Sequence, residues 1–320
     1  MSAKEKSCGL LDYPKESEKE LNKILASLTN VVGLPYDSYL FEKVKLSIVY
    51  ENVKKYRIEV PNFKFVGDFY QGDGIDIIFD AKWGEHARTF KFHTSVEQAA
   101  AEWFLDMLGD EGIYFEKIEM EAIGKLDNYQ DKPGLFIVNN LEFNITDNNY
   151  KNGQLEWWIK KFRKEIKTLK INSPGTNGVV VKISEDFDSC PEHLELKGRF
   201  VIPHTVFPRT KAEKVVFEDY SKETIINSEL IILILKDWLA VAATPKEITL
   251  IANYEEKDIE QKVYNYMNKN RRVFEKDELT GAYTYKEDEI TMTFYRRGTS
   301  FNLKIFLSLE NLKNIEQSKK

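Results

Sequence analysis

Apolar and polar residues alternate at every second position through the segment 45–94, and this period most constrains what the chain can fold into. Leu46, Ile48 and Tyr50 alternate with their neighbours, and the same period returns in the segments 56–60 and 75–94. A period of two places successive side chains on opposite faces of a strand. The segment is therefore predicted to form antiparallel strands with one buried face and one solvated face.

Helical patterns interrupt these strands at several places. Ser95 and Gln98 stand at the spacing of a capping box, and an apolar stripe runs from Val96 to Met107 behind them. The same reasoning predicts further helices at 17–28, 155–169, 229–243 and 259–267.

The predicted elements are consistent with an α+β fold of two mixed domains, whose largely antiparallel sheets are flanked by helices. The polar, turn-forming stretch 146–153 is the best linker, which gives an N-terminal domain over 1–147 and a C-terminal domain over 148–320. The second domain is expected to end in an antiparallel meander over 282–307. Strands and helices follow no regular βαβ alternation, and no repeat of solenoid or propeller period is expected.

Composition narrows the classes of protein that fit. Hydrophobic residues make up 42% of the chain and charged residues 31%, a balance typical of folded globular proteins. The net charge of -6 argues against a protein that binds nucleic acid through overall positive charge. Cys8 and Cys190 suit a reducing compartment, the apolar run 230–235 is too short to span a membrane, and no signal peptide is apparent, so a cytoplasmic location is expected.

One candidate site is the acidic segment 72–82, which reads GDGIDIIFDAK. It resembles the PD-(D/E)xK nuclease superfamily, particularly its Mrr-like members, in which such a turn enters a strand and a carboxylate-x-Lys triplet follows. The resemblance implies a Mg²⁺ ion held by Asp76 and Asp80 and a hydroxide steadied by Lys82, all three being catalytic. Another acid would complete the metal site, the candidates being Asp68, Asp73 and Glu119.

Alternation alone offers a second interpretation of the same segment. Two carboxylates four residues apart on one strand lie roughly 13 Å from each other, too far to share one metal. A turn at 84–87 would pair Asp80 with Lys91 on the wet face of an amphipathic hairpin. This interpretation is preferred.

The second candidate site is the basic amphipathic helix predicted at 155–169. Its cationic face could bind nucleic acid or an acidic protein surface, and Trp157 at the margin of the apolar stripe would anchor a protein interface. The binding residues are therefore Trp157, Lys160, Lys161, Arg163, Lys164 and Lys167.

Two functions remain open at this point. The preferred one is an intracellular, non-enzymatic macromolecule-binding protein that acts through protein–protein contacts, needs no cofactor and does not bind membranes. Its Lys-, Asn-, Glu- and Ile-rich composition suggests a bacterial or phage factor in defence or counter-defence. The alternative is a metal-dependent nuclease, intact or degenerate, that requires Mg²⁺. The identity of the partner and the oligomeric state do not follow from the sequence.

Overall fold

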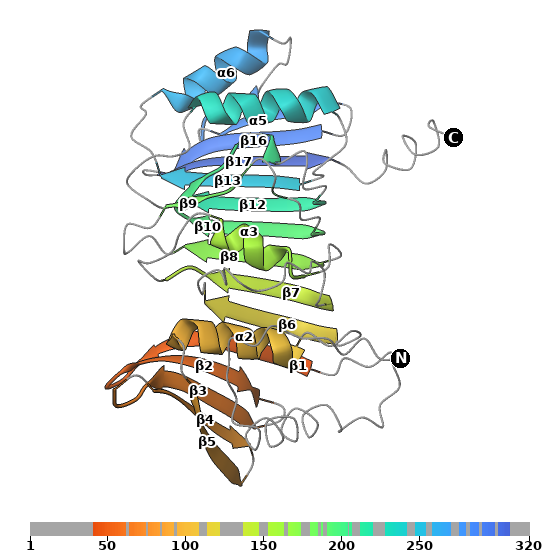
Figure 1. Ribbon diagram of the computed structural model, residues 1–320. Helices are drawn as coiled ribbons and strands as arrows, with labels where there is room; N and C mark the ends of the chain where they lie inside the picture. The colour runs from red at the N-terminus through yellow and green to blue at the C-terminus, as the bar shows by residue number, and fades with distance from the viewer. Residues whose placement is uncertain are drawn as a thin grey trace. The chain divides into compact units, whose positions relative to one another are not determined.

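The computed structural model forms two compact units, Met1–Glu165 (unit 1) and Ile166–Lys320 (unit 2), and each is described by itself (Figure 1). The structure describes residues 41–61, 64–74, 76–83, 85–92, 95–108, 114–121, 137–146, 153–162, 166–173, 180–184, 187, 191–203, 205–206, 212–219, 228–241, 247–253, 258–269, 275–279, 282–287, 290–297 and 300–307. The predicted helix at 17–28 lies outside them. The predicted domain boundary at 147/148 stays a prediction, because a compact packing unit need not be an independently folding domain.

Unit 1 is built on one mixed sheet in the order β7-β6-β1-β2-β3-β4-β5. Strands β1 to β5 form an antiparallel meander, whereas β6 runs parallel to β1 and β7 runs parallel to β6. The strands are β1 Phe41–Tyr50, β2 Lys54–Val60, β3 Phe65–Gln71, β4 Ile77–Trp83, β5 His86–Phe92, β6 Tyr114–Glu121 and β7 Ile137–Asn144.

Helix α2 (Val96–Leu108) covers the apolar face of the meander in unit 1. The predicted Ser95 cap is confirmed, because the Gln98 backbone N–H donates to Ser95 Oγ over 3.1 Å. The Gln98 side chain donates to Glu102 Oε1 over 2.9 Å and does not complete the predicted capping box. The fully buried Trp103 stacks on Phe65 with ring centroids 5.3 Å apart and also contacts Phe69 and Phe79. The short helix α3 (Gln154–Ile159) adds Trp158, whose ring meets Phe104 edge-on at 6.0 Å.

Unit 2 combines a parallel ladder with an antiparallel meander. Strands β8, β10, β12 and β13 are parallel in sequence order, and β17, β16, β15 and β14 continue the sheet in antiparallel fashion. The strands are β8 Thr168–Ser173, β10 His193–Gly198, β12 Lys214–Asp219, β13 Glu247–Asn253, β14 Glu275–Lys276, β15 Tyr283–Glu287, β16 Ile290–Arg297 and β17 Ser300–Leu307. Strands β9 (Val181–Lys182) and β11 (Phe200–Val201) form a second, parallel pair, and the helices are α5 (Ser228–Val241) and α6 (Ile259–Lys269).

The predicted fold class is wrong. Strands make up 54% of the described residues, which contain four helices, and the sheets are mixed rather than largely antiparallel and helix-flanked. The predicted helix at 155–169 fails in the same way, because α3 ends at Ile159 and strand β8 begins at Thr168. The apolar residues that were assigned to one helix belong in part to α3, where they follow the helical period of 3.6, and in part to β8, where they follow the strand period of two. No helix in the described residues is long and apolar enough to cross a membrane.

An internal repeat underlies the parallel strands of both units, against expectation. In each repeat three residues are buried: the first at position i, the second at i+3 and the third at i+5. This pattern begins at 115 and 138 in unit 1 and at 166, 191 and 212 in unit 2, an interval near the roughly 20–30 residues of solenoid repeats. The residue between the second and third buried positions of each repeat, such as Glu119 or Glu195, points to the opposite face of its sheet.

Candidate functional site

The face of the unit 1 sheet opposite α2 is almost wholly polar. The buried side chains Leu46, Ile58, Phe79 and Phe90 lie on the other side of their strands. We call this surface the polar face of unit 1. Its polar members include Lys43, Lys45, Arg57, Asp68, Tyr70, Asp80, Lys82, Thr89, Lys117, Glu119 and Glu142, and the strand register also places Val66 and Ile78 on it.

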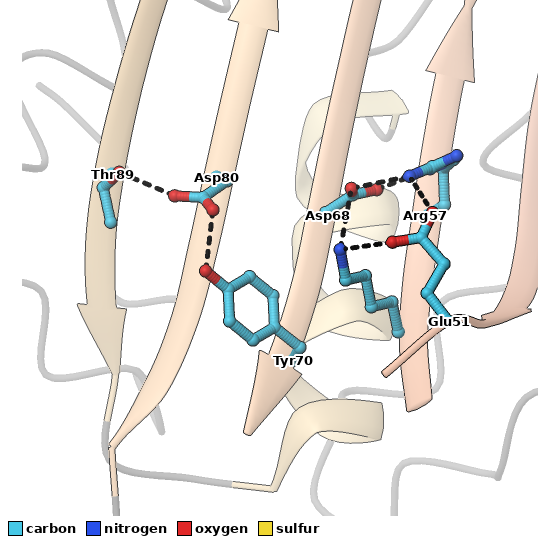
Figure 2. A network of polar contacts seen from close by, with 7 residues as sticks. Glu51, Arg57, Asp68, Tyr70, Asp80 and Thr89 are labelled. Atoms are coloured by element: carbon cyan, nitrogen blue, oxygen red, sulfur yellow. Dashed lines mark hydrogen bonds and ion pairs between the residues drawn. The ribbon is translucent and has the colours of Figure 1, made fainter. Parts of the chain in front are cut away.

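A row of directly opposed residues crosses four strands of this face. Arg57 pairs with Asp68, Asp68 with Asp80, and Asp80 with Thr89. Arg57 binds Asp68 in a bidentate manner, with Nε donating to Oδ1 over 2.6 Å and a terminal nitrogen donating to Oδ2 over 2.8 Å (Figure 2). The hydrogen bonds to Asp68 raise the pKa of the guanidinium, which therefore stays charged.

The carboxylate of Asp80 is held by two neutral hydroxyl groups. The Tyr70 hydroxyl donates to Oδ2 over 2.7 Å, and the Thr89 hydroxyl donates to Oδ1 over 2.6 Å (Figure 2). The hydrogen bond to Asp80 raises the pKa of Tyr70 to about 12, and burial of the hydroxyl acts in the same direction. Both oxygens of Asp80 are thus engaged within the sheet.

Of the residues of the predicted nuclease site, Asp80 lies directly opposite Asp68 on β3, whereas Asp76 lies close to Lys91. Asp76 precedes β4, and its Oδ2 lies 3.5 Å from Lys91 Nζ. Lys82 is exposed and makes no hydrogen bond or ion pair with Asp76 or Asp80 in the described part of the chain. Nor do the described residues contain a group of three or more His, Cys, Asp or Glu side chains suited to a metal.

The predicted register of the acidic hairpin is wrong by two residues. Trp83 pairs with His86, so only two residues connect β4 to β5, and Asp80 faces Thr89 while Lys91 faces Ile78. A two-residue connection matches the natural twist of a hairpin better than the four-residue turn that was predicted. The alternation of buried and exposed residues along β4 is confirmed.

The residues of the predicted basic helix occupy different environments. Trp157 is only 7% exposed and packs edge-on against Trp158 at 5.0 Å, and Lys161 is fully buried with Nζ 4.4 Å from the Trp157 ring centre. Lys160 and Lys167 are exposed. Arg163 and Lys164 lie outside the described residues.

Lysine and glutamate side chains alternate across the parallel strands of unit 1. Glu119 Oε1 accepts from Lys43 at 2.9 Å and from Lys117 at 2.6 Å, and Lys117 also reaches Glu142 at 3.0 Å. Burial acts to raise the pKa of Glu119, but the hydrogen bonds from Lys117 and Lys43 outweigh it and hold that pKa below its usual value. These four residues form the lysine–glutamate chain of unit 1.

Unit 2 carries the same arrangement on its own parallel strands. Glu195 binds Lys170 at 3.1 Å and Lys197 at 2.6 Å, and Lys197 lies 3.7 Å from Glu218. These four residues form the lysine–glutamate chain of unit 2, beside which Lys214 pairs with Glu247 at 2.9 Å. Sequence reasoning missed both chains.

His193 lies on the same face of unit 2, between Thr168 of β8 and Lys214 of β12. Burial lowers the pKa of its imidazole despite the nearby Glu195, so the ring is neutral at physiological pH. Within the described residues its Nε2 atom is buried and has no hydrogen-bond partner. Together with the lysine–glutamate chain, it makes up the polar face of unit 2.

Comparisons with protein-family models, with curated proteins and with solved structures found no match to this chain.

Proposed function

We propose that this protein binds a macromolecular partner, a protein, through the polar faces of its parallel strands. The observation that carries the proposal is the recurrence of one lysine–glutamate chain, with the same order of charges, on the parallel strands of both units. Proteins with repeated strands commonly use the face formed by their polar positions as an extended binding surface.

The balance of charge on the parallel strands of unit 2 favours a protein over a nucleic acid. In unit 2 the ion pairs join Lys170, Lys197 and Lys214 to Glu195, Glu218 and Glu247, so each cation is matched by an anion. Nucleic-acid affinity depends on a surplus of cations that displaces counterions from phosphates. Paired charges in fixed positions instead give specificity and orientation in protein complexes.

The nuclease hypothesis has weaker support in the geometry. Its central acid, Asp80, already accepts hydrogen bonds at both oxygens from Tyr70 and Thr89. A role in defence or counter-defence stays a prediction from composition.

Affinity capture with the full chain tests the proposed function. Reversing one lysine of each chain, Lys117→Glu and Lys197→Glu, should lower the affinity for a captured and then purified partner by at least about tenfold. Lys160→Glu makes the same change of charge at an exposed position on neither face and should leave the affinity unaltered. Equal binding by the two kinds of variant would refute the proposal. Cleavage of DNA with Mg²⁺ or Mn²⁺ that disappears in Asp80→Asn would establish the nuclease instead.

A further inference from the structure

Strand β5 forms one edge of the unit 1 sheet. Among the strands that the structure describes, it is hydrogen-bonded to β4 on one side and to no strand on the other (Figure 1). Its register with β4 runs through seven consecutive pairs without a bulge. The strand contains no proline, and Ala87, Thr89 and Lys91 are exposed. Two devices that commonly keep an edge strand from pairing, a bulge and a proline, are therefore absent from β5.

The hydrogen bonds between β3 and β4 determine which backbone groups point outward from β5. The Gly72 N–H donates to the Asp76 carbonyl oxygen over 2.9 Å, next to the last pair of the β3–β4 ladder. Because bonded and non-bonded pairs alternate along an antiparallel ladder, the even-numbered residues of β4 direct their backbone groups toward β3 and the odd-numbered ones toward β5. The even-numbered residues of β5 complete the latter bonds. The N–H and C=O groups of Ala87, Thr89 and Lys91 thus point away from the sheet.

We infer that β5 pairs with β5 of a second copy of this chain, antiparallel and centred on Thr89, to form a two-fold symmetric dimer. Thr89 then lies opposite the partner's Thr89, and Ala87 lies opposite the partner's Lys91. These are hydrogen-bonded pairs, in which both residues exchange N–H and C=O groups, so all the outward groups of both strands are satisfied. The inference is independent of the proposed function, because it uses an edge of the sheet rather than a polar face.

The charges of β5 suit this register. The strand carries Arg88 and Lys91 and no acidic residue, and like charges directly opposite each other destabilise a sheet. Thr89 is the middle residue of β5, so the register centred on it gives the two strands their full overlap. Arg88 then faces the partner's Phe90, and Lys91 faces the partner's Ala87. Neither cation lies opposite a second cation.

The two faces of the sheet also match across the dimer. A two-fold axis perpendicular to the sheet keeps each face of one copy on the same side as that face of the other. The buried Phe90 therefore lies on the side of α2 in both copies, and Thr89, bonded to Asp80, lies on the polar side in both. An edge that is complementary to itself needs no second surface, and two-fold contacts of this kind are the commonest in protein assemblies.

Sedimentation equilibrium of the full chain over a concentration series tests the inference. The mass should rise from that of one chain to that of two. Thr89→Pro should abolish the rise, because proline removes the central outward N–H and leaves the bonds to β4 in place. Thr89→Val is the matched control, since it loses the same hydroxyl bond to Asp80 but keeps the N–H, and it should dimerise like the unaltered chain. A mass of one chain up to the highest soluble concentration would overturn the inference.

Disulfide cross-linking tests the register and does not depend on how well the proline variant folds. In a Cys8→Ser, Cys190→Ser background, Thr89→Cys should form a covalent dimer on mild oxidation, because the Cα atoms of a hydrogen-bonded pair lie about 5.5 Å apart. Ala87→Cys should not, because the two copies of residue 87 are offset by four residues, roughly 13 Å along the strands. Cross-linking at 87 but not at 89 would contradict the register and overturn the inference.

Two further outcomes would overturn it. One is a dimer that persists in a folded Thr89→Pro variant. The other is a chain that stays monomeric but loses a captured partner in Thr89→Pro and not in Thr89→Val, since the edge would then bind a foreign strand. Lys117→Glu and Lys197→Glu should leave the dimer unchanged, so the proposed function and this inference fail separately.

Discussion

Gly198 at the end of β10 lies directly opposite Ser173 of β8, and the two backbones approach each other very closely. A Cβ atom on Gly198 would lie 1.7 Å from the Ser173 carbonyl oxygen, and the glycine has a φ of 127°. Only glycine tolerates that combination of conformation and contact. The parallel ladder of unit 2 thus depends on the residue type at this one position.

The first prediction concerns this contact. Gly198→Ala should lower the free energy of unfolding by about 3 kcal/mol or more, because a left-handed conformation is strained and the methyl group collides with backbone. Gly74→Ala is the matched control: Gly74 has a φ of 78° with nothing within 4 Å of an added Cβ, so its cost should be only about 1 kcal/mol. Chemical denaturation measures both, and equal costs would show that the close approach to Ser173 is not rigid.

The second prediction concerns the hydroxyl of Tyr70. Its pKa is raised to about 12 by Asp80, so the hydrogen bond stabilises the fold fully below pH 10 and is lost as the pH rises through 12. Tyr70→Phe should cost about 1 kcal/mol at neutral pH, a value that allows for solvent screening, and should remove this alkaline loss. Tyrosinate absorbance should show a late-titrating step that moves to lower pH in Asp80→Asn. Tyr50→Phe, at an exposed position, should leave the free energy of unfolding and its alkaline loss unchanged.

The third prediction concerns acid stability of the lysine–glutamate chains. Burial opposes ionisation of Glu195, but hydrogen bonds from Lys197 and Lys170 lower its pKa below 4.5, and Glu119 behaves alike. Their contribution to stability is therefore present above pH 4.5 and is lost as the pH falls through the lowered value. Glu195→Gln should flatten the dependence of the unfolding free energy on pH in the acid range. A slope identical to that of the unaltered protein would contradict these ion pairs.

The fourth prediction concerns Trp157. Because its ring is buried against Trp158 and Lys161, Trp157→Ala should lower the free energy of unfolding by about 3–5 kcal/mol, the usual cost of deleting a buried aromatic ring. Lys160→Ala, at the neighbouring exposed position, should change it by less than about 0.5 kcal/mol. If Trp157→Ala weakened partner binding without altering stability, Trp157 would instead be an interface residue.

The success of sequence reasoning followed the strength of local signals. Helix α2 was predicted because Ser95 caps it and its apolar stripe has a single period. The closing meander was predicted because apolar and polar residues alternate along β16 and β17. Strand β8 was missed, since Leu169 continued the helical spacing of the residues before it. The parallel strands β10 and β12 were also missed, because their apolar spacing becomes a repeat only when several segments are aligned.

The candidate site shows the same division between local and distant information. The alternation along β4 identified Asp80 as a residue of the wet face, but its partner depended on the length of the connection to β5. Lys170 and Glu195 lie on different strands, far apart along the chain, and only the register of the parallel ladder brings them together. One sequence alone does not predict which side chains of different strands face each other, because that depends on how the strands are aligned in the sheet.

Within the part of unit 2 that the structure describes, each parallel strand is hydrogen-bonded in the sheet to the strands on either side of it, so the ladder is modular. Duplication or loss of one repeat would lengthen or shorten the polar face by one strand without disturbing the others, and a descendant chain could acquire a partner of different length in a single genetic step. New lysine–glutamate ion pairs would then be needed only between the added strand and the strands beside it, or between the two strands that a loss brings together.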